Sequence, residues 1–547
     1  MKNLFITLII LATLVSSGCK KDFLDRAPLD SYTNTVLWKS SSDVLAALNG
    51  CYSKWGGGNN GYYGVFADNN SDNTFDQFPW ENWLALSAGI ATPTNPGYTK
   101  WNYSCIQTCN WFLDNVGAAN MDATLKARTI GEARFLRAYE YFMLSQLYGA
   151  VPLVEHNLTT DEANKVTQAS KADVVKFVLN ELTAIAPNLP VSYSGSDLGR
   201  ITQGAAIALK ARVELFNQMY PECIADCQKL MTAPFTYSIY PSYINLFRQP
   251  FADNQEVILD VQFKPSDNNF GWARNMTINS LGGYNSIAPT QNLVDAYETT
   301  NGKTIDDPAS GYNPAQPYQN RDPRLSATVF YPGAQYGSKD GTDGNKLPYG
   351  YYYDPISSNP KTIDHWGDNN CSPSAYGLRK YTPFIADFPN MDQVGMDVIL
   401  IRYAEIKLMD AEAKIESNKI DPTVYDDINA VRKRTGVNMP AVDQSKYNDQ
   451  SSLRTLLRRE RRVELAVEGL RWFDIQRWQI GQQVMNGQVT GSLLGTVNQA
   501  TGAVTLTPGT TIKVGAARVF DPAKNYLWPI PQTEIDLNKS LKQNPGY

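Results

Sequence analysis

Histidine is almost absent from this chain, which has only His156 and His365 among its 547 residues. Neither stands in an HExxH motif, and no GxSxG motif occurs. A Ser-His-Asp site would have to use one of two isolated histidines, and a zinc hydrolase of the HExxH type would lack its pair of ligands. These absences argue against the hydrolase classes that depend on histidine.

The chain also lacks an excess of positive charge. It has 49 Lys and Arg residues against 54 Asp and Glu residues, which gives a net charge of −5 at pH 7. Proteins that bind nucleic acid usually carry a basic patch, so we expect no nucleic-acid partner. The hydrophobic content of 43% is typical of a packed globular protein and not of a disordered one.

Only one long apolar segment is present, and it lies at the start of the chain. Lys2 precedes a mostly apolar run at 4–15, which is shorter than the roughly 20 residues that span a bilayer. This pattern, followed by small residues and Cys19, is typical of a secretory signal peptide. It also resembles a bacterial lipobox, although Ser16 stands where Leu is preferred. In a lipobox Cys19 is acylated and residues 1–18 are removed, and two or more acyl chains anchor the protein stably. The alternative is an ordinary signal peptide with a chance cysteine.

Six cysteines follow Cys19: Cys51, Cys105, Cys109, Cys223, Cys227 and Cys371. Two pairs have i, i+4 spacing, which places each pair on one face of a helix. An exported protein could oxidise them to disulfides, and the sequence does not assign the pairing. The spacing could also serve a metal, but no CxxC and no neighbouring histidine supports this. The simplest interpretation is cysteines packed in the core.

Three regions of the chain differ in texture. Residues from about 40 to 232 are rich in helical patterns, and residues from about 233 to 392 are dense in Tyr, Asn, Asp, Gly and Pro. Helical patterns return from about 393 to 480, before a Gly/Thr-rich stretch and an extended tail. The texture therefore indicates a helical scaffold with a loop-rich part in its middle.

Hydrophobic periodicity predicts several individual elements. Helices are expected at 132–148, 203–219 and 401–415, with Gly149 ending the first of them. Alternation of apolar residues predicts a strand at 257–263. The segments 504–506 and 512–514, with Pro508-Gly509 between them, are interpreted as a small hairpin.

Two clusters of polar and charged residues are candidate ion-binding sites. Four oxygen-bearing residues match positions 1, 3, 5 and 9 of a calcium loop: Asp68, Asn70, Asp72 and Asp76. Asn73 replaces the turn glycine and Pro79 the bidentate glutamate, so an EF-hand is not expected. A basic run at 458–462 surrounds Glu460, which lies on an apolar helical stripe. We therefore expect Glu460 to be buried and paired with arginine, a structural role and not an anion site.

Several segments, spread over nearly the whole chain, resemble the SusD/RagB family. Each is weak alone, but together and in this order they are specific: Cys19 to Asp25 with Pro28, 134–153, 204–212, 401–413, 428–432, 460–469 and 529–547. The resemblance implies a mainly α fold, a scaffold of tetratricopeptide-type helical pairs with a loop-rich, partly β irregular subdomain. It also implies the boundaries of a signal peptide at 1–18, a helical region at 19–232, a loop-rich ligand-binding region at 233–392 and C-terminal helices with a tail at 393–547.

The same resemblance implies a role. Such proteins are outer-membrane lipoproteins of Bacteroidota that form lids on a SusC-type TonB-dependent transporter at the cell surface. They capture an oligosaccharide, or sometimes a peptide, and are not enzymes. No cofactor or metal is implied. Lipidation is expected at Cys19. An enzyme of glycan breakdown that uses an unidentified pair of carboxylates is kept as an alternative.

Aromatic residues in polar loops are the binding candidates. Sugar rings stack their C–H faces on indole and phenol rings, while Asn, Asp and Arg bind the hydroxyls. The candidates are Asp72, Asn73, Trp80, Trp83, Trp272, Tyr284, Tyr351 and Trp366. For any single aromatic residue, burial in the core is an equally good interpretation. As a set, we expect one of Trp80 and Trp83 to share an exposed face with at least one of the later four.

Overall fold

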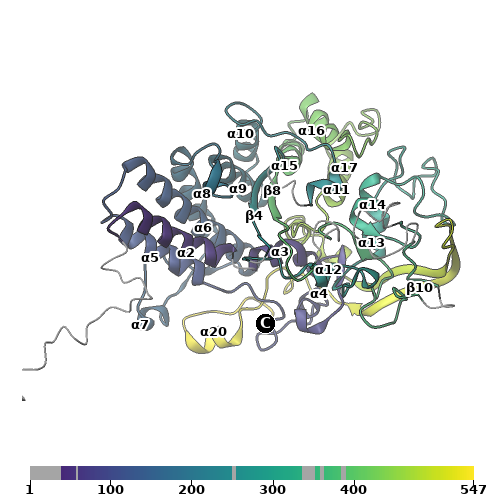
Figure 1. Ribbon diagram of the computed structural model, residues 1–547, viewed down its shortest axis with the longest axis horizontal. Helices are drawn as coiled ribbons and strands as arrows, with labels where there is room; N and C mark the ends of the chain where they lie inside the picture. Colours follow the sequence, from purple (N-terminus) through teal and green to yellow (C-terminus); the bar gives the residue numbers. More distant parts are fainter. Residues whose placement is uncertain are drawn as a thin grey trace, which may run out of the picture.

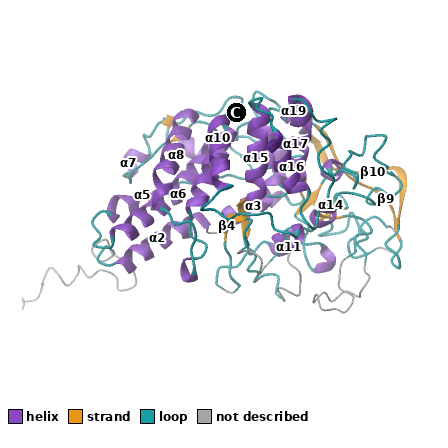
Figure 2. Ribbon diagram, turned by 90° about the horizontal axis from the view of Figure 1, so that it is seen from above, coloured by secondary structure: helices purple, strands orange, loops and turns teal. Residues whose placement is uncertain are grey.

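Helices are the predominant secondary structure of the molecule (Figures 1 and 2). The structure is a computed structural model that describes residues 38–56, 59–248, 254–265, 267–335, 352–357, 362–382 and 390–547. The long helices before the loop-rich region are α2 (Ser41–Gly56), α5 (Ser104–Val116), α6 (Ala123–Tyr148), α8 (Lys171–Ile185), α9 (Gln203–Phe216) and α10 (Tyr220–Leu230). Those after it are α15 (Tyr403–Glu416), α16 (Pro422–Arg432), α17 (Gln450–Glu464) and α18 (Arg471–Arg477).

Shorter helices connect these elements. They are α3 (Asn59–Phe66), α4 (Leu84–Ser87), α7 (Thr160–Ala163), α11 (Tyr243–Leu246), α12 (Ala273–Met276), α13 (Gln291–Ala296), α14 (Pro323–Thr328), α19 (Gly481–Val484) and α20 (Gln532–Leu537). Single 3₁₀ turns are η2 (Ala67–Asn70), η3 (Pro79–Glu81), η4 (Ala186–Asn188), η5 (Gly195–Asp197) and η6 (Asn279–Leu281).

Local capping residues fix the ends of the long helices. The Asp122 side chain accepts a hydrogen bond from the Leu125 N–H at 2.8 Å and so caps the start of α6. Gly149 ends this helix with a φ of 75°. Pro221 lies in the first turn of α10, where its missing N–H has no effect. The helices expected at 132–148, 203–219 and 401–415 are confirmed as α6, α9 and α15. The bounds of α9 and α15 agree within a few residues, whereas α6 begins nine residues earlier than expected, at Ala123.

Consecutive helices pack against each other along the scaffold. Helix α6 lies between α5 and α8, and α9 lies between α8 and α10. Helix α10 then contacts α15, which in turn packs against α16 and α17. The helices on either side of the loop-rich region therefore form one continuous row, which Figure 2 shows from above.

Within the described residues the strands form five two-stranded antiparallel sheets. The pairs are β1 (Thr74–Asp76) with β5 (Ile287–Pro289), β2 (Val151–Pro152) with β3 (Gln168–Ala169), β4 (Val257–Val261) with β8 (Val398–Arg402), β6 (Val329–Phe330) with β7 (Gly377–Leu378), and β9 (Gly487–Val497) with β10 (Val504–Arg518). The expected strand at 257–263 is confirmed as β4.

The expected small hairpin around Pro508-Gly509 is wrong. Both of its proposed strands belong to the single long strand β10, whose partner is β9. The turn lies earlier, where the N–H of Gly502 donates to the carbonyl of Asn498 at 2.8 Å. Pro508-Gly509 instead lies between Leu506 and Thr511, where the register shifts, so these residues form an irregularity within a strand.

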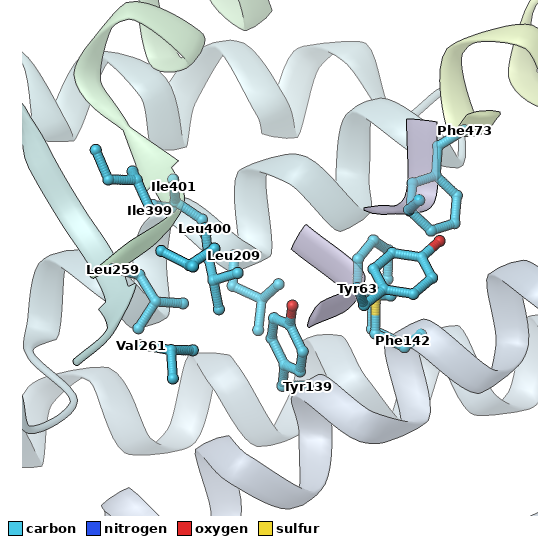
Figure 3. Close-up of a cluster of buried hydrophobic side chains, with 14 of the residues drawn as sticks. Tyr63, Tyr139, Phe142, Leu209, Leu259, Val261, Ile399, Leu400, Ile401 and Phe473 are labelled. Carbon is cyan, nitrogen blue, oxygen red and sulfur yellow. The ribbon is translucent and has the colours of Figure 1, made fainter. Parts of the chain in front are cut away.

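Strands β4 and β8 lie at the centre of the core (Figure 3). Leu259 of β4 and Ile401 of β8 are register partners. Around them pack Leu209 of α9, Tyr139 of α6 and, further along, Phe473 of α18. We name this strand pair, 257–261 with 398–402, the neck, because the chain leaves the scaffold through β4 for the loop-rich region and returns through β8.

A network of buried ion pairs joins the loop-rich region to the last helices. Glu460 is buried and bonds to Arg324 of α14 and to Arg432 of α16, each at 2.6 Å. Glu464, one turn later, pairs with Arg402 of β8 and Arg434 at 2.7 Å each. Burial alone would raise the pKa of Glu460, but its two arginines outweigh this and lower it. The expectation of a buried Glu460 paired with arginine is confirmed.

The cysteines of the described chain are packed inside. All six, Cys51 through Cys371, are buried free thiols. Cys105 and Cys109 lie on α5, and Cys223 and Cys227 on α10, where their sulfur atoms are 3.9 Å apart. This confirms the interpretation that the helical cysteines belong to the core.

Candidate functional site

The most exposed large aromatic side chain of the described residues is Trp80, with 70% of its surface accessible. It lies in η3, a turn that Pro79 starts and Asn82 ends in a left-handed conformation with a φ of 69°. The Asn82 side-chain amide donates to the Trp80 carbonyl at 3.0 Å. The ring of Phe78 stacks on Trp80, with centroids 4.5 Å apart and an angle of 18°. One face of the indole is thus supported from within the same turn.

Two further exposed aromatic residues lie around α12. Trp272, 37% exposed, precedes this helix and packs against Tyr62 with centroids 4.6 Å apart. Tyr284, 38% exposed, follows it and donates its backbone N–H to the Arg274 carbonyl at 2.9 Å. Both residues therefore extend from a single short helix and the loop packed on it.

Hydrogen bonds join the Trp80 turn to α12. The Asn275 side-chain amide donates to Oε1 of Glu81 at 3.1 Å. The backbone around Ser286 accepts from Gln77 and donates to Asn275, which ties β1 and β5 to the same helix. Figure 1 shows α4 and α12 next to each other below α3. We name the exposed residues Trp80, Trp272 and Tyr284 the aromatic surface.

Polar groups border the aromatic surface. Arg274 of α12 pairs with the exposed Asp392, with Nε and Oδ1 2.7 Å apart. The same guanidinium donates to the Gly282 carbonyl at 3.1 Å, beside Tyr284. Flat rings next to an exposed charged pair and amides can stack on a sugar ring and bind its hydroxyl groups. Phe78, Arg274 and Asp392 were not among the sequence candidates; only the spacing of Phe78 two residues before Trp80 could have suggested it.

Trp83 does not belong to this surface, which corrects the expectation for it. Its side chain is fully buried and stacks on Tyr98 with centroids 4.2 Å apart. The indole N–H donates to the Tyr62 hydroxyl at 3.0 Å. Because the Trp83 backbone N–H is held by Oδ2 of Asp76, the ring is directed inward. Trp83 and Tyr62 are therefore buried beneath the aromatic surface, and a ligand does not reach Trp83.

Asp72 and Asn73 are also buried and are not available as ligand contacts. Asp72 pairs with Arg471 at 2.7 Å and with Arg462 at 3.0 Å. Asn73 accepts from Arg462 and donates to Asp68 at 3.0 Å. Burial raises the pKa of Asp72, but Arg462 and Arg471 outweigh it and bring the pKa down to about 2. These polar residues hold the loop against α17 and α18, which explains why an apparently solvated segment is internal.

Of the two remaining candidates, the structure describes Trp366 alone. Trp366 is half-buried and packs with Ile356 and Val489 against the β9–β10 hairpin. Tyr351 lies outside the residues that the structure describes, as does Cys19. Among described residues no group of three or more His, Cys, Asp or Glu is arranged to hold a metal ion.

A separate cavity of about 290 Å³ lies between α5, α7 and α20. Its wall is largely apolar and includes Trp101, Ile106, Leu158 and Leu537, with Glu534 at its edge. Burial raises the pKa of Glu534. No sequence pattern indicated this cavity, because its lining comes from three segments far apart in the chain.

Comparisons with known proteins decide the family. A model described as the SusD family matches residues 255–547, which is more than half of the chain. The chain belongs to the SusD family. A second model, described as starch-binding and associating with the outer membrane, matches residues 22–215 of this SusD-family protein. The expected family and the expected mainly helical fold are thereby confirmed.

Solved structures agree with this assignment. A SusD-like carbohydrate binding protein from Bacteroides fragilis is 30% identical, with a TM-score of 0.81, over 92% of this chain and 100% of its own. A second SusD-like protein from the same species is 28% identical, with a TM-score of 0.80, over 95% and 100%. A SusD-like protein from Bacteroides ovatus is 24% identical over 86% of this chain and 82% of its own. In the described part of this SusD-family protein, none of the helices is long and apolar enough to cross a membrane.

Proposed function

We propose that this protein is a non-enzymatic binding protein for an oligosaccharide or polysaccharide nutrient, and that the aromatic surface is its binding site. The observation that carries the proposal is Trp80, which is largely solvent-exposed and yet rigidly backed by Phe78. A ligand that covers this indole gains from its burial, because burying an aromatic side chain contributes about 1.5–3 kcal/mol. Trp272 and Tyr284 extend this surface around the hydrogen bond between Asn275 and Glu81.

The comparisons support a glycan as the ligand. The 30% identical structure from Bacteroides fragilis is named a carbohydrate binding protein. In addition, the family model for residues 22–215 is described as starch-binding and associating with the outer membrane. From these we infer a lipid-anchored protein of the outer membrane, attached through Cys19 and exposed at the cell surface. It would deliver its glycan to a SusC-type TonB-dependent transporter.

The first prediction tests the binding surface. Trp80→Ala and Trp272→Ala should each weaken glycan binding by about 2 kcal/mol or more, roughly 30-fold in Kd, because each removes a stacking anchor. The measurement is isothermal titration calorimetry against a panel of glycans and peptides. Trp80→Phe should retain most of the affinity, since a flat ring remains.

The matched control is Trp101→Ala. Trp101 is a half-buried indole that packs edge-on against Tyr148 and lies in the separate cavity, not in the aromatic surface. It should lower the melting temperature about as much as Trp272→Ala does while leaving the glycan affinity unchanged. Equal loss of affinity in the control and surface variants would contradict the proposal. Binding of peptides only, or release of reducing ends from a polysaccharide, would favour the peptide-binding or the enzymatic alternative instead.

A further inference from the structure

The turn that presents Trp80 is held on both sides by one carboxyl group. Asp76, the last residue of β1, is fully buried. Its Oδ1 accepts from the Phe78 N–H at 3.3 Å, and its Oδ2 accepts from the Trp83 N–H at 3.0 Å. The two donors flank Trp80, so the position of the indole depends on this carboxyl group.

A second carboxyl group lies against the first. Glu81 ends η3 and is only 6% exposed. Its Oε1 accepts from the Asn275 amide of α12 at 3.1 Å. Its buried Oε2 accepts no hydrogen bond within 3.5 Å from the described residues, although the Ser286 hydroxyl faces the same carboxyl group. A buried carboxylate oxygen without a donor is destabilising, because it loses the hydrogen bonds that water would provide. A proton on this oxygen would remove the cost, because a protonated carboxyl group donates one hydrogen bond.

In the described part of the chain, neutral groups face the pair. The groups that face it are the Tyr62 hydroxyl of α3, Asn275 of α12 and Ser286 before β5. Neither carboxyl group forms an ion pair with any residue of the described chain. Burial and the close approach of the two carboxyl groups raise the pKa of the pair, so that it retains a proton at neutral pH. Two buried carboxyl groups in contact cannot both ionise at neutral pH.

We propose that Asp76 and Glu81 share one proton, carried on Oε2 of Glu81 and donated to Asp76, and that this shared proton positions Trp80 for glycan binding. The proton is assigned to Glu81 because both oxygens of Asp76 already accept backbone N–H groups. Asp76 and Glu81 are positioning residues, since neither is exposed to a ligand. The functional part of the inference rests on the proposed glycan site.

The pH dependence follows from the direction of the shift. The folded protein retains a proton that the unfolded chain would release near pH 4, so the fully formed turn is favoured at low and neutral pH. As the pH rises through about 8, the pair loses its proton and two carboxylates repel each other. The turn then loosens and Trp80 loses its fixed position.

Two substitutions separate the roles of the carboxyl groups. Glu81→Gln imitates the protonated state, because its amide can donate to Asp76 while its oxygen accepts from Asn275. Asp76→Asn cannot imitate it, because one of its two side-chain atoms becomes a donor facing a backbone N–H. Both substitutions replace one carboxyl group by an amide of the same shape. The two variants therefore differ in the position of the hydrogen-bond donor and not in charge.

The second prediction is a pH profile of glycan affinity by calorimetry between pH 6 and 9.5. Wild-type affinity should fall about 10-fold or more above pH 8, corresponding to at least one pKa unit of coupling. Glu81→Gln should bind as wild type does at pH 6 and remain unchanged up to pH 9.5. Asp76→Asn should bind weakly at every pH. A Glu81→Gln profile that still falls above pH 8 would overturn the proposal.

Two measurements need no glycan. Infrared spectra of wild type and Glu81→Gln should differ at pH 6.5 by the band of one protonated carboxyl group, and this difference should be lost above pH 8. Acrylamide quenching, compared between wild type and Trp80→Phe, should show that Trp80 becomes more accessible over the same pH range. Absence of either signal would overturn the inference. If both signals are present but no glycan binds, the proposed function fails and the shared proton stands.

Discussion

At the scale of single residues, many charged side chains of this protein form buried ion pairs. Glu460 lies in the middle of a basic run, yet it faces inward and is bonded to Arg324 and Arg432. Its neighbour Arg459 pairs with Glu298 of the loop-rich region at 2.5 Å. The arginines around Glu460 are therefore occupied by carboxylates of their own chain, and an anionic ligand is not needed to explain them.

The third prediction concerns this network. Glu460→Ala should lower the free energy of unfolding by about 3–5 kcal/mol, because it leaves Arg324 and Arg432 buried without a shared partner. Urea denaturation measures the change. The control is Glu222→Ala, an exposed glutamate on α10, which should change stability by less than about 0.5 kcal/mol. Equal stability of the two variants would show that the buried pair contributes nothing.

At the scale of elements, the β9–β10 hairpin depends on close contact with the loop at 372–376. The Ser492 N–H donates to the Ser374 carbonyl at 2.9 Å. A Cβ atom on Gly491 would lie 2.2 Å from the same carbonyl oxygen, which is shorter than any real contact. Glycine at 491 is thus required by the approach of two backbones.

The fourth prediction follows from this contact. Gly491→Ala should destabilise the protein by about 1–3 kcal/mol, because a backbone must shift to admit the methyl group. Thermal and urea unfolding would measure the loss. In Gly117→Ala, at the end of α5, the new Cβ meets no atom within 4 Å in a helical conformation. This control should be neutral or slightly stabilising, by up to about 1 kcal/mol.

The same element shows where sequence reasoning reaches its limit. Periodicity identified α6, α9 and α15 because their apolar residues recur within each helix. Pro508-Gly509 was mistaken for a turn, since local chemistry does not show which strand will be the partner. Asp72 and Asn73 were mistaken for solvent-exposed groups. Their partners, Arg462 and Arg471, lie about 400 residues further along the chain and leave no local signal.

The aromatic candidates also include both correct and incorrect predictions. Trp80, Trp272 and Tyr284 were identified correctly as exposed, whereas Trp83 is internal. Trp80 and Trp83 lie three positions apart in one polar loop. The Trp83 N–H donates to Asp76, and its ring stacks inward on Tyr98. Composition can therefore indicate a binding loop, but the assignment of each side chain depends on tertiary contacts.

At the scale of the whole molecule, the proposed attachment is a lipid on Cys19, reached by a short segment before α2. The fifth prediction is that Cys19→Ala incorporates no labelled fatty acid and is found uncut or in the soluble fraction, because the acylated sulfur is lost. Metabolic labelling and fractionation of the expressing cells measure both results. Cys371→Ala, which alters a buried thiol, should be labelled as wild type is. A Cys19→Ala protein that is still labelled and processed would exclude the lipobox.

The neck has a consequence for how such a molecule can diversify. Val257 of β4 and Arg402 of β8 are register partners. The chain segment between them therefore begins and ends at the same place on the scaffold. Recombination between relatives could therefore replace that segment in a single exchange while the row of helices stays intact. The graft must keep Arg324 and Glu298, since these residues hold it to α16 and α17. Such an exchange would replace Trp272 and Tyr284 and leave Trp80, which precedes β4, in place. New specificities can then arise without redesign of the helices.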